Sequence, residues 1–165
     1  MTTPALFDPE RPATPAVAGP RPAPFVIPLP AGLPLLNSNR ALHYKDRMKA
    51  VAKLRRAARD AVSECPALMD ALDAVRPRPL FQRAHVLGVV HPKGNGRHDP
   101  ANWYPSFKAA VDGIVDAGLL EDDDHTRLLG PDMRLGPVVK GGQLVLVVRG
   151  LAPDEDPLGY GAVTR

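Results

Sequence analysis

Apolar residues recur every three or four positions along residues 44–62, the spacing that places them on one face of an α-helix. Lysine and arginine residues form a second, separate stripe on the same segment. A helix with these two stripes can pack one face against a core while the other presents positive charge to solvent or to phosphate groups. We therefore predict a helix here, with a packed face formed by Tyr44, Met48, Val51, Leu54, Ala58 and Val62.

Shorter patterns predict the remaining elements. Pro28 favours the edge of a sheet for the first strand, because proline cannot donate a ladder hydrogen bond. The segment Lys140-Gly141-Gly142 is typical of a tight hairpin between the last two strands. Pro100 and Pro105 indicate a single helical turn followed by a new helix, which ends at Gly118. We predict strands over 25–29, 81–90, 134–139 and 143–149, and helices over 67–75 and 105–117.

Together these elements predict an α/β (α+β) fold in which two main helices pack on a small mixed β-sheet. The length of 165 residues fits one domain, expected over residues 25–152. Residues 1–24 are rich in proline and poor in large apolar side chains, so we predict a disordered N-terminal tail. Residues 153–165 have a similar composition and are predicted to form a flexible C-terminal tail.

Composition excludes several classes of protein. A single cysteine, Cys65, excludes an intrachain disulfide and a cysteine-clustered zinc site, and it indicates a reducing compartment. No uninterrupted apolar stretch reaches about 18 residues, so we expect no membrane span. The chain has no Gly-x-Gly-x-x-Gly motif and no phosphate-binding loop, so we expect no nucleotide cofactor. We expect a cytoplasmic protein.

Positive charge is concentrated in one region of the chain. The net charge is only +3, but between residues 40 and 60 basic residues far outnumber the two acids, Asp46 and Asp60. This asymmetry favours a polyanionic partner such as a nucleic acid, although a plain solvated helix face would show the same pattern. The predicted nucleic-acid-binding residues of this region are Arg40, Lys45, Lys49, Lys53 and Arg56.

Negative charge is concentrated in the four consecutive acids of residues 121–124. Such a run persists only if water solvates it or a cation neutralises it. If the helix that carries Lys108 packs back across the sheet, the run would meet Asp99, and the carboxylates would suit Mg²⁺ or Mn²⁺. Lys108 and Asp112 lie four residues apart on one face of this helix. Simpler interpretations remain open: Asp99 before a proline is typical of a helix N-cap, Lys108 can be a solvated surface residue, and the run can be a solvated loop.

The order of these motifs resembles the RusA family of Holliday junction resolvases. The resemblance is carried by Arg97-His98-Asp99-Pro100-Ala101-Asn102, then by Lys108-Ala109-Ala110-Val111-Asp112, and then by residues 116–123 with their Ala-Gly-Leu-Leu-Glu-Asp-Asp sequence. It implies a small mixed α/β fold, a homodimer, and cleavage of four-way DNA junctions that depends on Mg²⁺ or Mn²⁺. A bacterial protein of host or phage origin would fit this interpretation.

The resemblance also assigns roles to residues. It implies that Asp99, Lys108 and Asp123 are catalytic, and that Asp99, Asp122 and Asp123 bind the metal ion. Arg97 and Asn102 join the predicted nucleic-acid-binding residues. The chain departs from the family at Ala101, where the family has a second aspartate. The candidates to compensate for it are Asp112, Asp122 and Asp124.

Two further functions fit the same residues. The protein can be a non-catalytic DNA-binding protein that has the fold but a decayed metal site, because one carboxylate is missing. It can also be a phosphodiesterase that acts on small or RNA substrates, which would show no preference for junctions.

Overall fold

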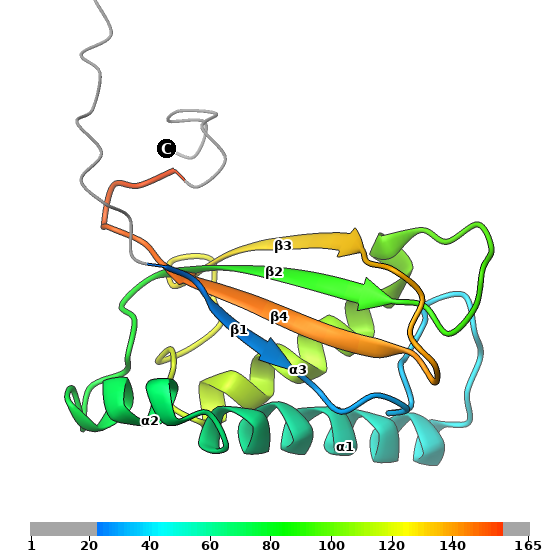
Figure 1. The fold of residues 1–165 in the computed structure, drawn as a ribbon, viewed down its shortest axis with the longest axis horizontal. Helices are drawn as coiled ribbons and strands as arrows, with labels where there is room; N and C mark the ends of the chain where they lie inside the picture. Colours follow the sequence, from blue (N-terminus) through cyan, green and yellow to red (C-terminus); the bar gives the residue numbers. More distant parts are fainter. Residues whose placement is uncertain (1–22, 157–165) are drawn as a thin grey trace, which may run out of the picture.

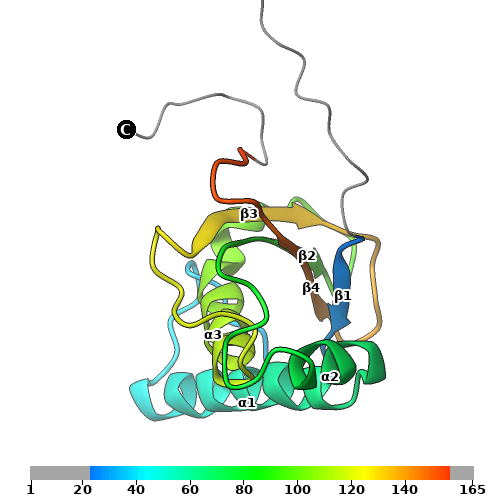
Figure 2. The same ribbon diagram turned by 90° about the vertical axis from the view of Figure 1, so that its left-hand side faces the viewer.

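The strands form one layer and the helices a second layer against one face of it (Figures 1 and 2). The computed structural model describes residues 23–156, so most of the predicted N- and C-terminal tails, 1–24 and 153–165, lies outside the described residues. The elements are β1 (Phe25–Pro28), α1 (Tyr44–Ser63), α2 (Pro66–Asp73), β2 (Ala84–His91), a 3₁₀ helix η1 (Pro100–Trp103), α3 (Tyr104–Asp116), β3 (Leu128–Leu135) and β4 (Gln143–Gly150).

The sheet is mixed, as the sequence predicted. Its four strands lie in the order β1-β4-β2-β3; β4 is antiparallel to both of its neighbours, and β3 runs parallel to β2. β2 and β4 alternate between buried and half-buried residues, because one face of each packs against the helices. The predicted edge position of β1 is confirmed, and β2 lies between two other strands. The helix α3 connects the parallel strands β2 and β3, which cannot be joined by a tight turn.

The predicted hairpin between residues 134–139 and 143–149 is wrong. A tight turn does form, since the amide of Gly142 donates to the carbonyl of Val139 over 2.8 Å. The strand before it is β3, however, which ends at Leu135 and is separated from β4 by β2. The chain between β3 and the turn crosses the end of β2, where the amide of Gly136 donates to the carbonyl of Val90. The strand escaped prediction because its Gly130-Pro131 sequence is typical of a loop, and an edge strand tolerates this proline.

The two main helices pack closely against each other. Gly113 of α3 lies so near α1 that a Cβ atom there would come within 2.2 Å of the backbone oxygen of Arg55. The buried face of α1 consists of Ala50, Leu54, Ala58 and Val62. The predicted packed face was wrong at its start, because Tyr44 is 71% and Met48 is 48% exposed. Within residues 23–156, no other element covers the first turns of α1, whose residues 44–49 are all exposed.

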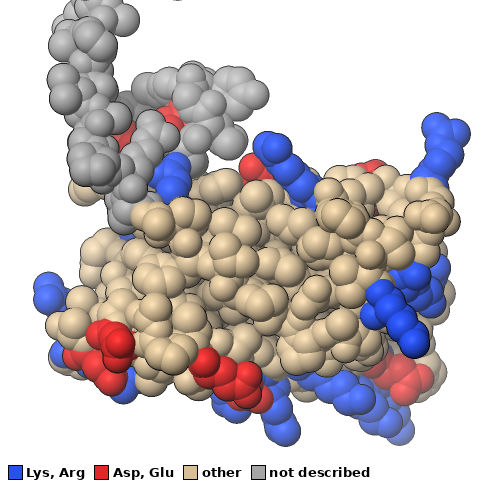
Figure 3. Space-filling view, in the orientation of Figure 1, with Lys and Arg blue, Asp and Glu red and all other residues tan. Residues whose placement is uncertain are grey.

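Charged side chains have an uneven distribution over the surface. The face of the sheet that is turned away from the helices has few of them, whereas Lys and Arg side chains project from the edge of the molecule along which α1 runs (Figure 3). No helix within residues 23–156 combines the length and the apolar character needed to cross a membrane.

The chain beyond β4 is attached to the sheet as far as the described residues reach. Arg83 donates hydrogen bonds to the carbonyl oxygens of Ala152, Pro153 and Glu155, over 3.1, 3.0 and 2.8 Å. Arg149 forms an ion pair with Glu155 at 2.5 Å. The first residues of the predicted C-terminal tail therefore contact Arg83, directly before β2, and Arg149 of β4.

Candidate functional site

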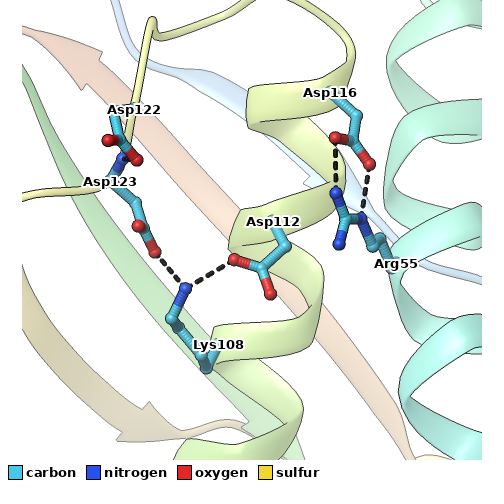
Figure 4. Close-up of polar contacts among 6 residues, drawn as sticks. All are labelled: Arg55, Lys108, Asp112, Asp116, Asp122 and Asp123. Atoms are coloured by element: carbon cyan, nitrogen blue, oxygen red, sulfur yellow. Dashed lines mark hydrogen bonds and ion pairs between the residues drawn. The ribbon is translucent and has the colours of Figure 1, made fainter. Parts of the chain in front are cut away.

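The candidate site centres on Lys108, in the second turn of α3. Its Nζ lies 2.5 Å from Oδ1 of Asp112, one turn further along the helix, and it also donates to the carboxylate of Asp123 (Figure 4). The two carboxylates thus converge on one ammonium group from two different segments of the chain. The site is partly open to solvent, since the Lys108 side chain is 44% exposed and that of Asp123 is 23% exposed.

The turn after α3 brings Asp123 to this place. The helix ends at Asp116, and Gly118 takes a positive φ of 92° that reverses the direction of the chain. Leu119 and Leu120 follow and are buried in the core, so they anchor the start of the acidic run. The run therefore returns alongside the helix that it has just left.

The four acids of the run have different roles. Glu121 forms an ion pair with Arg127 at 2.5 Å. Asp122 accepts a hydrogen bond from the backbone amide of Asp123 over 2.7 Å, and Asp124 accepts from the amide of Thr126 over 2.6 Å. Only Asp123 directs its carboxylate at Lys108. The run is thus not a single four-carboxylate cation site, as Figure 4 shows for Asp122 and Asp123.

Electrostatics strengthen the contacts of Lys108. Burial by itself would lower the pKa of its ammonium group, but the hydrogen bonds to Asp112 and Asp123 outweigh burial, so the pKa lies above its usual value. Lys108 is therefore positively charged at any pH near neutrality. This positive charge neutralises much of the repulsion between the two carboxylates.

Asp99 lies before α3 in the chain, at the N-terminus of η1. Its Oδ1 accepts a hydrogen bond from the amide of Ala101 over 3.0 Å, and Pro100 begins the turn. This is the N-cap that the sequence Asp-Pro indicated, and the predicted restart of the helix is confirmed by α3, which begins at Tyr104. Within the described residues, Asp99 has no hydrogen bond or ion pair to the acidic run, and its second carboxylate oxygen has no partner.

The loop before α1 is held against the same turn. The amide of Ser38 donates to the backbone oxygen of Asn102 over 2.7 Å. The hydroxyl of Ser106, which is fully buried, accepts from the amide of Leu36 over 2.6 Å and donates to its carbonyl over 3.0 Å. Arg40 therefore follows a loop that is fixed beside the turn of Asp99 and Asn102. The buried Ser106 was not predicted, because an isolated serine belongs to no specific sequence pattern.

Most of the predicted nucleic-acid-binding residues are free to bind an anion. Six of them are exposed and form no ion pair within residues 23–156: Arg40, Arg97 and, on α1, Lys45, Lys49, Lys53 and Arg56. Arg55, on the same helix, is different. It binds Asp116 of α3 through two hydrogen bonds of 2.5 and 2.7 Å, which connect the two helices (Figure 4). This pairing raises the pKa of Arg55 and lowers that of Asp116.

The predicted metal-binding set of Asp99, Asp122 and Asp123 is not gathered at one point. In the part of the chain that the structure describes, no three His, Cys, Asp or Glu side chains lie close enough together to hold a metal ion. The physical reason is local: Asp99 and Asp122 each bind a backbone amide of their own segment. Asp123 instead shares the ammonium group of Lys108 with Asp112, one of the candidates to compensate for Ala101.

The chemistry of this pair fits a divalent ion. Mg²⁺ is commonly held by one or two carboxylates while waters and substrate phosphates complete its octahedron. Asp112 and Asp123 direct their oxygens at one cation, which Lys108 supplies in the present arrangement. Two carboxylates on separate segments that already share a cation are therefore a suitable donor set for Mg²⁺ or Mn²⁺.

No protein-family model matches the chain, and no curated protein matches it either. The resemblance to the RusA family therefore depends on sequence motifs alone, and its specific part lies in residues 97–124.

Proposed function

We propose that this protein is a structure-selective DNA endonuclease of the RusA type, which resolves four-way junctions by phosphodiester hydrolysis and depends on Mg²⁺ or Mn²⁺. The observation that carries the proposal is the convergence of Asp112 and Asp123 on Lys108. Four exposed cations of α1, Lys45, Lys49, Lys53 and Arg56, support a nucleic acid as the substrate, because within residues 23–156 they form no ion pair and so provide a basic surface on a neighbouring helix.

The residues of the site would have different roles in the reaction. Asp112 and Asp123 would hold the divalent ion, and waters and the substrate phosphate would complete its coordination. A bound divalent ion supplies Lewis-acid polarisation of a phosphate oxygen and lowers the pKa of an attacking water. Lys108 places a positive charge beside the scissile phosphate and stabilises the negative charge that it gains in the transition state.

A homodimer belongs to the same proposal. A four-way junction is resolved by two symmetric nicks, and a two-fold axis would relate two identical sites to equivalent strands. Sedimentation of the purified protein, alone and with an equimolar junction, tests this part separately from cleavage.

The proposed activity is tested with purified protein on an end-labelled four-way junction and on a linear duplex of the same sequence. We expect paired nicks in the junction with Mg²⁺ or Mn²⁺, no product in EDTA, and at most weak nicking of the linear duplex. Equal cleavage of both DNAs, or preference for RNA or for small phosphodiesters, would contradict the selectivity for junctions.

One observation favours the second candidate, a non-catalytic DNA-binding protein. Lys108 already forms ion pairs with both carboxylates, so a cation lies between them without a metal ion. The two candidates differ in the same assay, because a non-catalytic protein would bind the junction in EDTA and give no product with any divalent ion at any protein concentration.

The basic stripe of α1 has its own prediction. Replacing Lys45, Lys49 and Lys53 together by glutamine should weaken binding of all DNAs and flatten its dependence on salt. The slope of log K against log[salt] should fall by roughly 0.9 for each phosphate that the variant no longer neutralises. Filter binding in EDTA at several salt concentrations measures the slope. Lys140→Gln, a lysine in the turn before β4, is the control and should leave the slope unchanged; an unchanged slope in the triple variant would place the DNA elsewhere.

A further inference from the structure

A small cavity lies directly beside the Lys108–Asp123 pair, between α3 and β3. Its volume is about 160 Å³. The floor is apolar and consists of Phe107, Val111 and Leu128, which are all buried. Since Lys108 and Asp123 themselves line the cavity, a group bound there would lie next to the place where the proposed function needs the scissile phosphate.

The rim of the cavity carries an exposed aromatic ring. Tyr104, in the first turn of α3, is 42% exposed although it is a large ring. It stacks on Phe107 with 6.1 Å between the ring centroids and 29° between the planes, so its orientation is fixed by the floor of the cavity. His125 lies on the rim as well and is exposed. The cavity therefore combines an apolar floor, a flat aromatic ring and polar groups at the edge.

These properties select a class of ligand. A planar ring with polar edges matches them, and a nucleotide carries such a ring next to its phosphate. The cavity volume of about 160 Å³ lies below the roughly 300–1,000 Å³ of pockets for drug-sized ligands. The cavity therefore suits a smaller group, such as a single base. A base inside a duplex is stacked on both sides and must leave the stack before it can enter such a cavity.

We propose that this cavity receives one unstacked nucleobase next to the phosphate that is cleaved, with Tyr104 as its stacking platform. This inference depends on the proposed function for the position of the phosphate, and it names the substrate class more narrowly. The favoured DNA is one in which a base has already left the stack, as at a branch point, because the cost of unstacking is then smallest.

The test measures whether the contribution of Tyr104 to binding depends on the presence of one particular base. Four-way junctions are prepared in which each nucleotide near the branch point is in turn replaced by an abasic one, and their affinities for wild-type protein and Tyr104→Ala are measured in EDTA. We expect one abasic position at which wild-type binding weakens by roughly tenfold, in line with the loss of one base–aromatic stack. Tyr104→Ala should bind the intact junction as weakly as wild type binds the abasic one, and it should lose nothing further at that position.

Two controls define the role of the ring. Tyr104→Phe keeps the stacking face and should behave as wild type. Leu135→Ala removes an apolar side chain of matched exposure, 41%, that does not line the cavity, and it should leave the pattern of affinities unchanged.

The outcomes separate the inference from the function on which it rests. If wild type and Tyr104→Ala lose the same factor at every abasic position, or neither loses any, the base-binding cavity is refuted, whether or not the junction is cleaved in Mg²⁺. If Tyr104 couples to one base but no divalent ion supports cleavage, the cavity stands and the nuclease proposal falls. Failure of wild type to bind the junction refutes both.

Discussion

Replacing Asp123 by asparagine is expected to reduce junction cleavage by at least about a hundredfold, while binding of the junction changes little. Even the outer partners of metal ligands typically contribute ten- to a hundredfold, and Asp123 is proposed to contact the ion directly. Asparagine keeps the size of the side chain but removes the negative charge that holds a divalent ion. Asp112→Asn should have a loss of the same order, because the two carboxylates face the same cation. Single-turnover cleavage in Mg²⁺ and Mn²⁺ measures both variants.

Neighbouring acids provide matched controls for this experiment. Asp122→Asn retains an oxygen that can accept from the amide of Asp123, and its carboxylate does not contact Lys108, so it should cleave within a few fold of wild type. Asp99→Asn is a second control. Asparagine is as good an N-cap as aspartate, so the turn is preserved, and because Asp99 does not lie with Asp112 and Asp123 this variant should also cleave within a few fold of wild type. Wild-type cleavage by both Asp123→Asn and Asp112→Asn would refute the metal site.

Replacing Lys108 by methionine is expected to abolish cleavage and, at the same time, to strengthen the binding of divalent ions to the free protein. The ammonium group lies between Asp112 and Asp123 and competes for the position that the ion would take. Lysine is protonated across the whole neutral range, and the raised pKa of Lys108 does not change this, so the competition persists throughout that range. Methionine has a similar length and no charge, so it leaves two facing carboxylates that repel each other. We expect binding of Mn²⁺ to tighten by roughly tenfold, a change of about 1.4 kcal/mol, measured by calorimetry without DNA.

Thermal unfolding tests the same prediction without an assay of cleavage. Lys108→Met should be less stable than wild type in EDTA and should gain more stability from added Mn²⁺, because a ligand that binds only the folded state shifts the unfolding equilibrium. Lys140→Met, which removes a charge of the same sign outside the carboxylate pair of the site, should show neither effect. If Lys108→Met binds Mn²⁺ no better than wild type, the lysine is a structural ion-pair partner and does not occupy a metal position.

The elements that the sequence predicted correctly are those whose formation depends on neighbouring residues. The helix α1 was predicted because hydrophobic periodicity depends on residues within one helix. The single helical turn at Pro100 and the new helix at Pro105 were predicted because proline restricts the conformation of its neighbours. β3 was missed because Gly130 and Pro131 resemble a loop unless the edge position of the strand is known. The false hairpin has the same origin, since a turn sequence specifies a turn but not which strands lie beside it.

In the site, too, contacts within one element could be predicted from the sequence, whereas contacts between distant segments could not. The contact between Lys108 and Asp112 follows from their spacing of four residues on one helix, and the N-cap role of Asp99 follows from the proline after it. The partnership of Asp123 with Lys108 requires the chain to reverse at Gly118 and to be anchored by two buried leucines. Composition and spacing could not select which of four adjacent acids faces the helix; only the resemblance to the RusA family singled out Asp123.

The amino-acid sequence by itself determined the mixed class of the fold, its main helices, the basic stripe and the presence of candidate ligands, because these depend on composition and on spacing within one element. Only the tertiary structure decided the order of the strands, the cavity beside Tyr104 and which carboxylates share a cation. Those features depend on where the chain returns after it leaves an element, and the packing of buried side chains from distant segments determines that return.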